Sequence, residues 1–187
     1  QDKTSKAYSN NQIQPDLIPV AVRHAELGWT LAMVDEPPRP GTTIEALDAL
    51  KTPFRANGRV SAGNAAGLND GATAALLASG AVADELGLTK KARLVTFAFA
   101  GVEPEVMGYG PVPATEKALK KAGLSISDIG LFEVNEAFGS VVIMWEKEMH
   151  ADMSKVNIFG GAMALGHPLG GSGARLMTTL LNALDVT

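Results

Sequence analysis

Residues 129–159 read IGLFEVNEAFGSVVIMWEKEMHADMSKVNIF. The apolar run at 129–134 has the length and composition of a strand, and so does the run at 156–159. The segment 136–150 between them has apolar residues at the spacing of one helical face, which are Phe138, Val141, Val142 and Trp145. A strand, a helix and a strand in this order predict an α/β fold.

The same alternation continues on both sides of this stretch. Residues 92–100 predict a strand, and residues 114–122 predict a helix that ends at Gly123. Beyond residue 159, a glycine-rich turn leads into a helix whose apolar stripe comprises Met177, Leu180, Leu181 and Leu184. Successive strand–helix units imply right-handed crossovers and a largely parallel sheet. The carboxyl ends of its strands are the expected functional edge.

The first half of the chain is less regular. Short elements are expected there: a frayed helix or loop at 1–14, strands at 17–22 and 30–34, and a helix at 43–50. Residues 72–79 are rich in alanine and predict a buried helix, which Asn69 or Asp70 would cap.

Composition and charge narrow the class of protein. With 187 residues, 46% of them hydrophobic, the chain can bury a core as one domain or two small ones. A net charge of -4 provides no basic field for nucleic acid. No apolar run approaches the roughly 20 residues of a membrane span, and the chain shows no signal peptide. We therefore expect a soluble protein.

The sequence contains no cysteine. The chain can therefore form neither a disulfide framework nor a thiolate metal site, and it cannot supply a cysteine nucleophile. Histidines and carboxylates do not cluster at ligand spacing, so neither a metal nor a redox cofactor is expected. His24 and His150 lie in no motif and are interpreted as surface or packing residues.

Two polar motifs lie where predicted strands meet helices. The first is VNEAF at 134–138, in which Asn135 either carries a function or simply accepts hydrogen bonds from helix amides as a cap. The second is GGAMALGHPLGGSGAR at 160–175, which matches no standard phosphate loop. In it, His167 follows a glycine and precedes a proline, where it could exchange protons or be structural. Ser172 is interpreted as a cap of the final helix.

Taken together, these motifs resemble those of the thiolase family, whose C-terminal half has an NEAF-type segment and a GGA…GHP segment. SAGNAAGLNDGA at 61–72 is similar to the family's TAGNASG-type loop, and GVEPEVMGYGPVPA at 101–114 is similar to its domain-joining segment. The resemblance covers most of the chain from Arg39 onward. It implies a five-layered α/β/α/β/α fold, present here only in part.

On this resemblance, residues 1–90 are the remainder of the N-terminal thiolase half, including the CoA-binding loop region. Residues 91–187 are an incomplete C-terminal half. The family uses a cysteine as acyl-accepting nucleophile and a second cysteine as acid and base. The resemblance places both cysteines in segments outside this chain.

The resemblance also assigns roles to individual residues. His167 corresponds to the histidine that deprotonates the nucleophilic cysteine, and Asn135 to the asparagine that holds a water. The histidine and that water form an oxyanion hole for the thioester oxygen, which is chemically reasonable because pre-aimed donors stabilise developing charge. Phe138 and Met107 match positions that line the acyl and pantetheine pocket.

The upstream loop supplies the rest of the expected CoA contacts. Phe54 and Ala62 match positions that pack on the pantetheine and adenine moieties, and Arg39 matches a basic residue near the nucleotide end. Ala66 stands where the family often has serine, so a hydroxyl contact to a pantetheine amide cannot be made directly. A water could take its place.

The resemblance predicts an acyl-CoA thiolase, an acetyl-CoA C-acyltransferase or acetyltransferase. It would carry out thiolysis of 3-ketoacyl-CoA, or the reverse Claisen condensation, through an acyl-cysteine. Acyl-CoA and CoA are the expected partners, with CoA as substrate, and the full-length protein is expected to be a homodimer or homotetramer. The compartment would be cytoplasmic in a bacterium and mitochondrial or peroxisomal in a eukaryote. The alternative is a noncatalytic thiolase-like protein that binds acyl-CoA or a partner; the ketoacyl synthase pattern is not matched.

Overall fold

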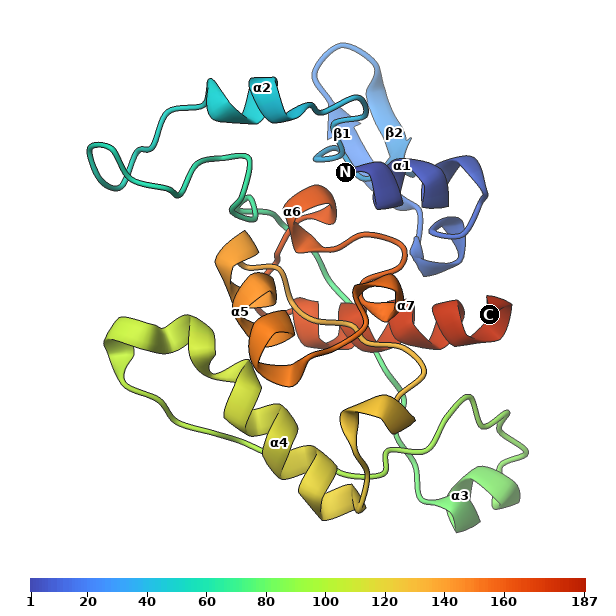
Figure 1. The fold of residues 1–187 in the computed structure, drawn as a ribbon. Coiled ribbons are helices and arrows are strands. Elements are labelled where there is room, and N and C mark those ends of the chain that lie inside the picture. Colours follow the sequence, from blue (N-terminus) through green and yellow to red (C-terminus); the bar gives the residue numbers. More distant parts are fainter.

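The computed structural model describes residues 1–187, and its C-terminal helix α7 (Ser172–Val186) crosses the middle of the molecule (Figure 1). In the view of Figure 1, α6 (Ala162–Leu165) is drawn above α7, and α5 (Gly139–Met149) to the left. Helix α1 (Asp2–Ser9) and a β-hairpin lie at one end of the molecule, and α4 (Pro111–Ala122) lies at the other. The remaining helices are α2 (Ile44–Asp48), α3 (Gly80–Glu85) and the 3₁₀ turns η1 (Gln14–Asp16), η2 (Pro104–Tyr109), η3 (Ile126–Asp128) and η4 (Met153–Lys155). None of these helices is long and apolar enough to cross a membrane.

The two short strands predicted in the first half form an antiparallel hairpin. Strand β1 (Val20–His24) pairs with β2 (Gly28–Ala32), with Val20 opposite Ala32 and His24 opposite Gly28. At the turn, the His24 ring Nδ1 accepts hydrogen bonds from the amides of Glu26 and Leu27. His24 is therefore a turn residue of the surface hairpin, as its sequence context suggested.

Three predicted helices are confirmed, with somewhat different ends. Helix α4 begins at Pro111, and Gly123 ends it with φ 68°, a left-handed conformation that favours glycine. The helix predicted at 136–150 is α5, which begins three residues later than expected. Helix α2 is shorter than the predicted 43–50, and the Thr43 hydroxyl caps it by accepting from the Ala46 amide at 3.2 Å.

The larger core lies between α4, α5 and the segments around residues 134 and 156. Its buried members are Val112, Val134, Val142, Trp145, Met149 and Val156. The Trp145 indole donates to the Thr115 hydroxyl at 3.0 Å and packs edge-on against Phe132, with ring centroids 5.2 Å apart. An indole that is both packed and hydrogen-bonded holds α4 and α5 in one orientation.

A smaller core joins the N-terminal segment to α7, and its buried members are Ala7, Ile13, Phe159 and Ala183. The helix that the spacing of Met177, Leu180, Leu181 and Leu184 predicts is confirmed as α7. Its apolar stripe is not the buried face, because Met177 and Leu184 are each about half exposed. Small buried residues face the core instead, and the Asp16 carboxylate accepts hydrogen bonds from Thr179 and Asn182. These hydrogen bonds to Asp16 hold the side of α7 that carries Thr179 and Asn182 against the N-terminal segment.

The predicted parallel sheet is reduced to a single bridge. Phe132 and Val156 lie side by side in parallel, as expected for the runs at 129–134 and 156–159. Residues 92–100 form no strand; instead, the carbonyls of Phe97 and Phe99 accept hydrogen bonds from lysine ammonium groups of α4. A strand needs a neighbouring backbone, and this segment has none within the chain.

The alanine-rich helix predicted at 72–79 is also absent. These residues form neither helix nor strand and are exposed. Helix α3 begins directly after them, and the Ser79 hydroxyl, rather than Asn69 or Asp70, caps it by accepting from Val82. Isolated helices of this length are marginal in water, and the segment packs on no apolar surface that would stabilise one.

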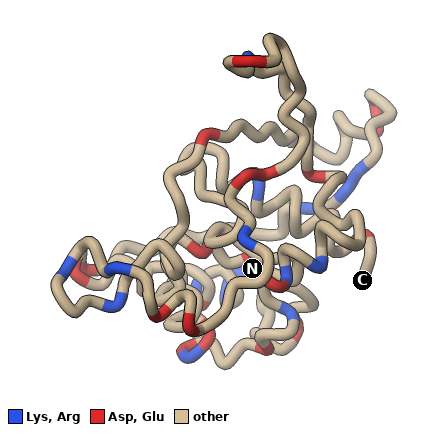
Figure 2. The backbone as a smooth tube through the Cα atoms, turned by 90° about the horizontal axis from the view of Figure 1, so that it is seen from above, with Lys and Arg blue, Asp and Glu red and all other residues tan.

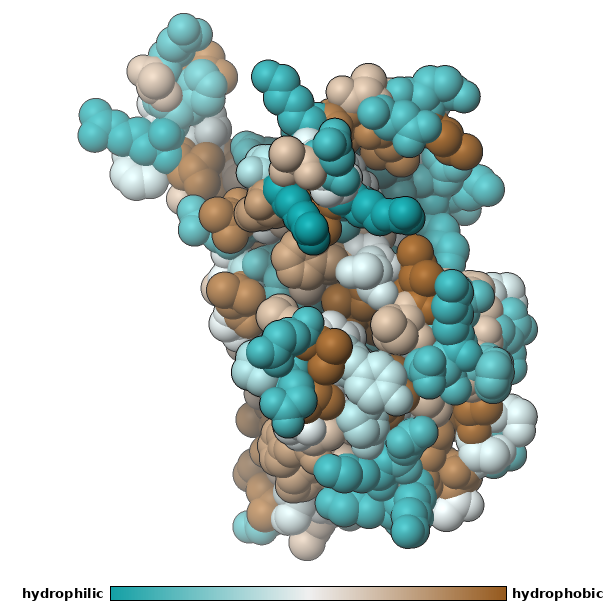
Figure 3. Space-filling view, turned by 60° about the vertical axis from the view of Figure 1, so that its left-hand side comes forward, coloured by the Kyte–Doolittle hydropathy of each residue, from teal (hydrophilic) through white to brown (hydrophobic).

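Charged and apolar residues are distributed differently over the surface. Basic and acidic residues are interspersed along the backbone (Figure 2), whereas large apolar side chains are visible among the polar ones in the space-filling view (Figure 3). Many of these apolar side chains lie on segments that form neither helix nor strand. Among them are Leu76, Leu77, Leu94, Val95, Phe97 and Phe99. Exposed apolar surface of this extent favours association.

We predict that the 187-residue chain self-associates on its own. Phe97 and Phe99 are 62% and 84% exposed, so replacing both with lysine should shift the chain toward monomer in sedimentation velocity experiments. A charge-matched control, Asn10→Lys with Thr89→Lys, replaces exposed polar residues and should not. A monomeric wild-type chain would contradict the prediction.

Candidate active site

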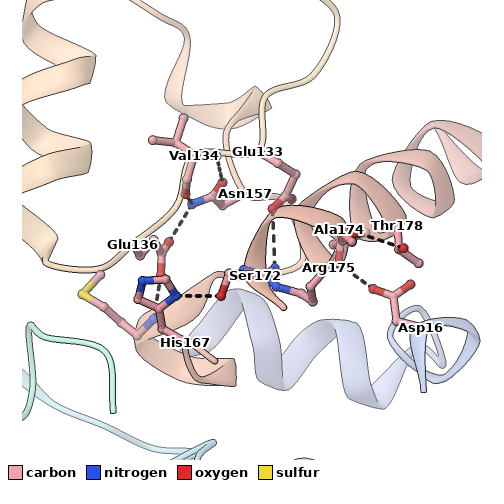
Figure 4. A network of polar contacts seen from close by, with 12 residues as sticks. Asp16, Glu133, Val134, Glu136, Asn157, His167, Ser172, Ala174, Arg175 and Thr178 are labelled. Carbon is pink, nitrogen blue, oxygen red and sulfur yellow. Dashed lines mark hydrogen bonds and ion pairs between the residues drawn. The ribbon is translucent and has the colours of Figure 1, made fainter. Parts of the chain in front are cut away.

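The site begins with a buried asparagine that takes the place of a neighbouring strand. The Asn157 side-chain oxygen accepts from the Val134 amide at 2.7 Å, and its nitrogen donates to the Val134 carbonyl at 2.9 Å. Asn157 is only 2% exposed and has φ 46°, a left-handed conformation that asparagine tolerates better than most residues. Its side chain therefore fixes the backbone just before the VNEAF motif (Figure 4).

Glu136 connects the same asparagine to the glycine-rich segment. Its carboxylate accepts from Asn157 Nδ2 at 2.8 Å and from the Met163 amide in the first turn of α6 at 3.2 Å. Gly161 leaves the space that this carboxylate fills, because a Cβ there would overlap it. The two motifs thus contact each other through one carboxylate, as Figure 4 shows.

These contacts bring Asn135 and His167 together. Asn135 Nδ2 lies 3.2 Å from His167 Nε2, and both residues are half-buried. Helix α5 starts at Gly139 with Phe138 at its N-cap position, so Asn135 is not a cap. The capping interpretation of Asn135 is wrong, and its amide is directed at the imidazole instead.

Residues of the upstream loop also bond to the backbone of the second motif, at 160–175. The Asn69 side-chain oxygen accepts from the His167 amide at 3.2 Å, and the Thr73 hydroxyl donates to the Gly171 carbonyl at 2.7 Å. Gly166 has φ 102°, and a side chain on it would overlap Asn69. The loop that carries the imidazole is therefore fixed at its backbone before and after the histidine.

The AGNA part of this loop pairs with the start of α5. The Ala66 amide donates to the Ala137 carbonyl at 3.0 Å, and the Gly139 amide donates to the Asn64 carbonyl at 2.8 Å. Ala65 and Phe138 form an antiparallel bridge. The structure thus pairs Ala65 with Phe138 and Ala66 with Ala137, next to the segment that carries Asn135.

Other sequence-predicted positions lie on exposed segments. Phe54 and Met107 are largely exposed, and Ala62 is exposed at the start of the AGNA loop. Met107 belongs to η2, which packs on α5. The Arg39 guanidinium donates to carbonyls of its own proline-rich loop, which are those of Glu36, Pro37 and Pro38.

Sequence reasoning missed the role of Ser172. Its side chain does not cap α7; the N-cap position is Gly171, with no side-chain cap. Instead Ser172 Oγ lies 2.6 Å from His167 Nδ1 and donates to the Pro168 carbonyl at 3.0 Å. The spacing of five residues between histidine and serine was visible, but only the turn of the loop directs them at each other. Asn157, Glu136 and Asn69 were missed for the same reason.

A buried ion pair lies behind these motifs. Glu133 and Arg175 are 3.8 Å apart, and the Glu133 side chain is only 3% exposed. Glu133 Oε2 and both terminal nitrogens of Arg175 have no hydrogen-bond partner. Burial raises the pKa of Glu133 from its usual 4.5 to about 7, although the nearby Arg175 charge lowers it. No group of three or more histidine, cysteine or carboxylate side chains is arranged to hold a metal.

Comparison with known proteins places this geometry in a family. The family model described as "Thiolase, C-terminal domain" matches residues 88–187, and "Thiolase, N-terminal domain" matches residues 1–81. The acetyl-CoA acetyltransferase of Thiocystis violacea is 46% identical over 97% of the chain and 46% of its own length. The 3-oxoadipyl-CoA/3-oxo-5,6-dehydrosuberyl-CoA thiolase of Escherichia coli K12 is 49% identical, over 94% of the chain and 44% of its own length.

Solved structures agree with these matches. The crystal structure of the Bacillus anthracis acetyl-CoA acetyltransferase aligns with a TM-score of 0.93 at 40% identity, over 98% of the chain and 46% of that protein. Human mitochondrial 3-ketoacyl-CoA thiolase in complex with CoA aligns with a TM-score of 0.87 at 38% identity, over 98% of the chain and 45% of that protein.

The protein is therefore an α/β protein with part of a thiolase-type fold. It belongs to the thiolase family, as both the family models and the sequence relatives show. The chain spans about half the length of the curated relatives it matches. The expected fold class and the resemblance are both confirmed.

The raised pKa of Glu133 predicts a pH dependence of stability. Since the folded-state pKa is about 7 against a usual 4.5, the stabilisation is fully present below pH 4.5 and is lost as pH rises through 7. The free energy of unfolding of the wild-type protein, compared with that of the Glu133→Gln variant at the same pH, should fall by up to about 3 kcal/mol across this window. Urea unfolding in the Phe97→Lys, Phe99→Lys background measures it.

Glu148→Gln serves as the control for this measurement, because Glu148 is exposed on α5 and its replacement should leave the pH dependence unchanged. The two proteins are compared from roughly pH 3.5 to roughly pH 8, about one pKa unit beyond each end of the window. If the difference between their free energies of unfolding stays constant over this range, the carboxyl of Glu133 does not titrate as its burial requires.

Proposed function

We propose that this chain contributes the histidine and asparagine side of an acyl-CoA thiolase active site within a longer protein. The observation that carries the proposal is the contact of Asn135 Nδ2 with His167 Nε2, on two motifs held together by Glu136, in a chain of the thiolase family. The names of the relatives support 3-ketoacyl-CoA as the substrate class, and the human relative's CoA complex supports CoA as acyl acceptor.

In this proposal His167 acts as the general base. Its Nε2 takes the proton of a cysteine thiol supplied by a segment outside these residues, since the chain has no cysteine of its own. The thiolate then attacks the 3-carbonyl carbon of 3-ketoacyl-CoA, the C2–C3 bond breaks, and the acyl group stays on the cysteine sulfur. The other fragment leaves as the enolate of acetyl-CoA and takes a proton from the second cysteine, which the resemblance also places outside this chain. CoA accepts that acyl group in the second half of the reaction.

Asn135 has the complementary task of holding a water for the thioester oxygen. Its side-chain oxygen is buried and accepts no hydrogen bond from the protein, while its nitrogen contacts the imidazole. A buried amide oxygen gains free energy from any donor that reaches it. A water on this oxygen would lie next to the imidazole, where both can donate to developing negative charge.

The CoA pocket is proposed along the upstream loop. Just before α5, Ala66 pairs with Ala137 and the preceding Ala65 pairs with Phe138. Met107 lies in η2, which packs on the same helix. Exposed apolar side chains at Phe54 and Met107 suit the pantetheine and acyl parts of the ligand. The guanidinium of Arg39 would have to exchange loop carbonyls for a phosphate.

A noncatalytic thiolase-like protein that binds acyl-CoA or a partner is the competing proposal, and the absence of cysteine favours it. The two proposals differ in what happens when the cysteine-bearing segments are supplied. For this test we define the joined protein as this chain linked to the cysteine-bearing segments of the Thiocystis violacea acetyl-CoA acetyltransferase, with which it is 46% identical.

The full-length protein is expected to form a homodimer or homotetramer.

We predict that the joined protein catalyses thiolysis of acetoacetyl-CoA, whereas the 187-residue chain alone does not. His167→Ala should slow both turnover and alkylation of the nucleophilic cysteine by iodoacetamide, because the thiolate loses its imidazolium partner. Asn135→Ala should lower turnover by roughly 10²–10³ and change alkylation little, because the water that Asn135 holds acts mainly on the thioester oxygen. Alkylation is followed against pH by peptide mass spectrometry.

His150→Ala removes an exposed histidine outside the motifs and should change neither rate. An inactive joined protein that still binds CoA would favour the noncatalytic proposal. Equal loss of alkylation in the Asn135 and His167 variants would show that Asn135 holds the imidazole and does not position a water.

Ala66 provides a separate test of the CoA pocket. Ala66→Ser restores a hydroxyl where the family often has one, so it should tighten CoA binding by about 0.5–1.5 kcal/mol, the net value of one hydrogen bond. The turnover number of the joined protein should stay nearly unchanged. Isothermal titration with CoA, beside steady-state kinetics, measures both.

Ala74→Ser, at an exposed position to which no CoA contact is assigned, is the matched control and should leave CoA binding unchanged. A fall in turnover without any change in CoA affinity would place the loop away from the pantetheine.

A further inference from the structure

The imidazole of His167 has a polar partner on each ring nitrogen. Nε2 faces Asn135 Nδ2 at 3.2 Å, and Nδ1 faces Ser172 Oγ at 2.6 Å. Ser172 is only 3% exposed, and its hydroxyl is also 3.0 Å from the Pro168 carbonyl. The histidine, the serine and the carbonyl therefore form a short chain of contacts within one loop.

One arrangement of protons satisfies all these contacts. A carbonyl can only accept, so the single Ser172 proton is donated to Pro168. The serine oxygen then accepts from Nδ1–H, which leaves Nε2 unprotonated and able to accept from Asn135 Nδ2. In the opposite tautomer, with the ring proton on Nε2, the Ser172 hydroxyl would donate its proton to Nδ1. The Pro168 carbonyl would then receive no hydrogen bond from the serine. This tautomer would also set Nε2–H against the Asn135 amide, which is a second donor. The tautomer with the proton on Nδ1 satisfies all three contacts, whereas the opposite tautomer satisfies one.

We infer that Ser172 is a positioning residue that selects this tautomer of His167 and orients its ring. This inference rests on the proposed function, because the tautomer matters where Nε2 must act as a base. A ring protonated on Nε2 has no lone pair there and cannot take a proton from the thiol. With Ser172 in place, the lone pair on Nε2 is directed away from the loop, toward Asn135.

The proton balance of the step follows from this arrangement. The cysteine S–H bond breaks and an Nε2–H bond forms, which gives a thiolate and an imidazolium. The Nδ1–H bond stays intact, and its hydrogen bond to Ser172 strengthens because the donor now carries charge. When the reaction returns the proton from Nε2, the ring regains the same tautomer without any rotation.

The experiment reads the protonation of each ring nitrogen directly. In joined protein labelled with ¹⁵N at histidine, the nitrogen chemical shifts of the neutral ring distinguish a protonated from an unprotonated nitrogen. His167→Gln identifies the signals by their disappearance. We expect the wild-type ring to carry its proton on Nδ1, and Ser172→Ala to produce a population protonated on Nε2. Alanine is well tolerated in the first turn of a helix, so α7 should still form.

Two variants separate the hydroxyl from general packing. Ser172→Thr keeps a hydroxyl and should retain the wild-type tautomer. Thr178→Ala removes another hydroxyl of α7, one that donates only to the Ala174 carbonyl, and should leave the ring unchanged. In kinetics, Ser172→Ala should lower kcat by roughly 10- to 100-fold with little change in KM, the cost typical of losing a group that orients a functional histidine. Ser172→Thr should restore most of this loss.

Outcomes for Ser172 and for the proposed function can be told apart. A wild-type ring protonated on Nε2, or a ring that Ser172→Ala leaves unchanged, would overturn the inference even in an active joined protein. An inactive joined protein whose ring loses its Nδ1 proton only in Ser172→Ala would support the inference and count against the thiolase proposal.

Discussion

The side chain of Asn157 is the interaction on which the site depends. It supplies the two hydrogen bonds to Val134 that a neighbouring strand would make, and a third to the carboxylate of Glu136. Each of these groups is at least partly buried, so loss of the amide would leave donors and acceptors unpaired at about 1–3 kcal/mol each. Both polar motifs take their positions from this one residue, because Glu136 in turn holds the first turn of α6.

The parts of the fold that could be predicted from sequence are those whose structure is decided locally. The helix at 114–122 has a proline at its start and a glycine at its end, and the runs around β1 and β2 are separated by a tight turn. Residues 72–79 and 92–100 have equally suggestive compositions, yet they form neither helix nor strand. A short helix needs a packing surface and a strand needs a neighbour, and sequence pattern shows neither.

In the site, too, residues marked by a local motif could be predicted from the sequence, whereas contacts between distant residues could not. Asn135 and His167 could be singled out from their motifs, and the structure brings their side chains into contact. Capping rules misassigned Asn135 and Ser172 because each precedes or begins a helix, where a polar residue usually bonds to helix amides. In each case the side chain turns toward the imidazole instead. The amide of Asn157 lies 21 residues from its Glu136 partner, a separation at which spacing says nothing about contact.

The contact between Asn135 and His167 also limits how the proposed base can work. Its length of 3.2 Å is at the long end for a hydrogen bond, so a thiol that reaches Nε2 can displace the amide at little cost. Once Nε2 is protonated, an amide N–H beside it would put two donors face to face. The buried oxygen of Asn135, which accepts from no protein group, is open to a water in the orientation that the side chain already has. Deprotonation of the thiol would thus weaken the contact between the amide and the ring and leave the Nε2–H free to donate to the thioester oxygen.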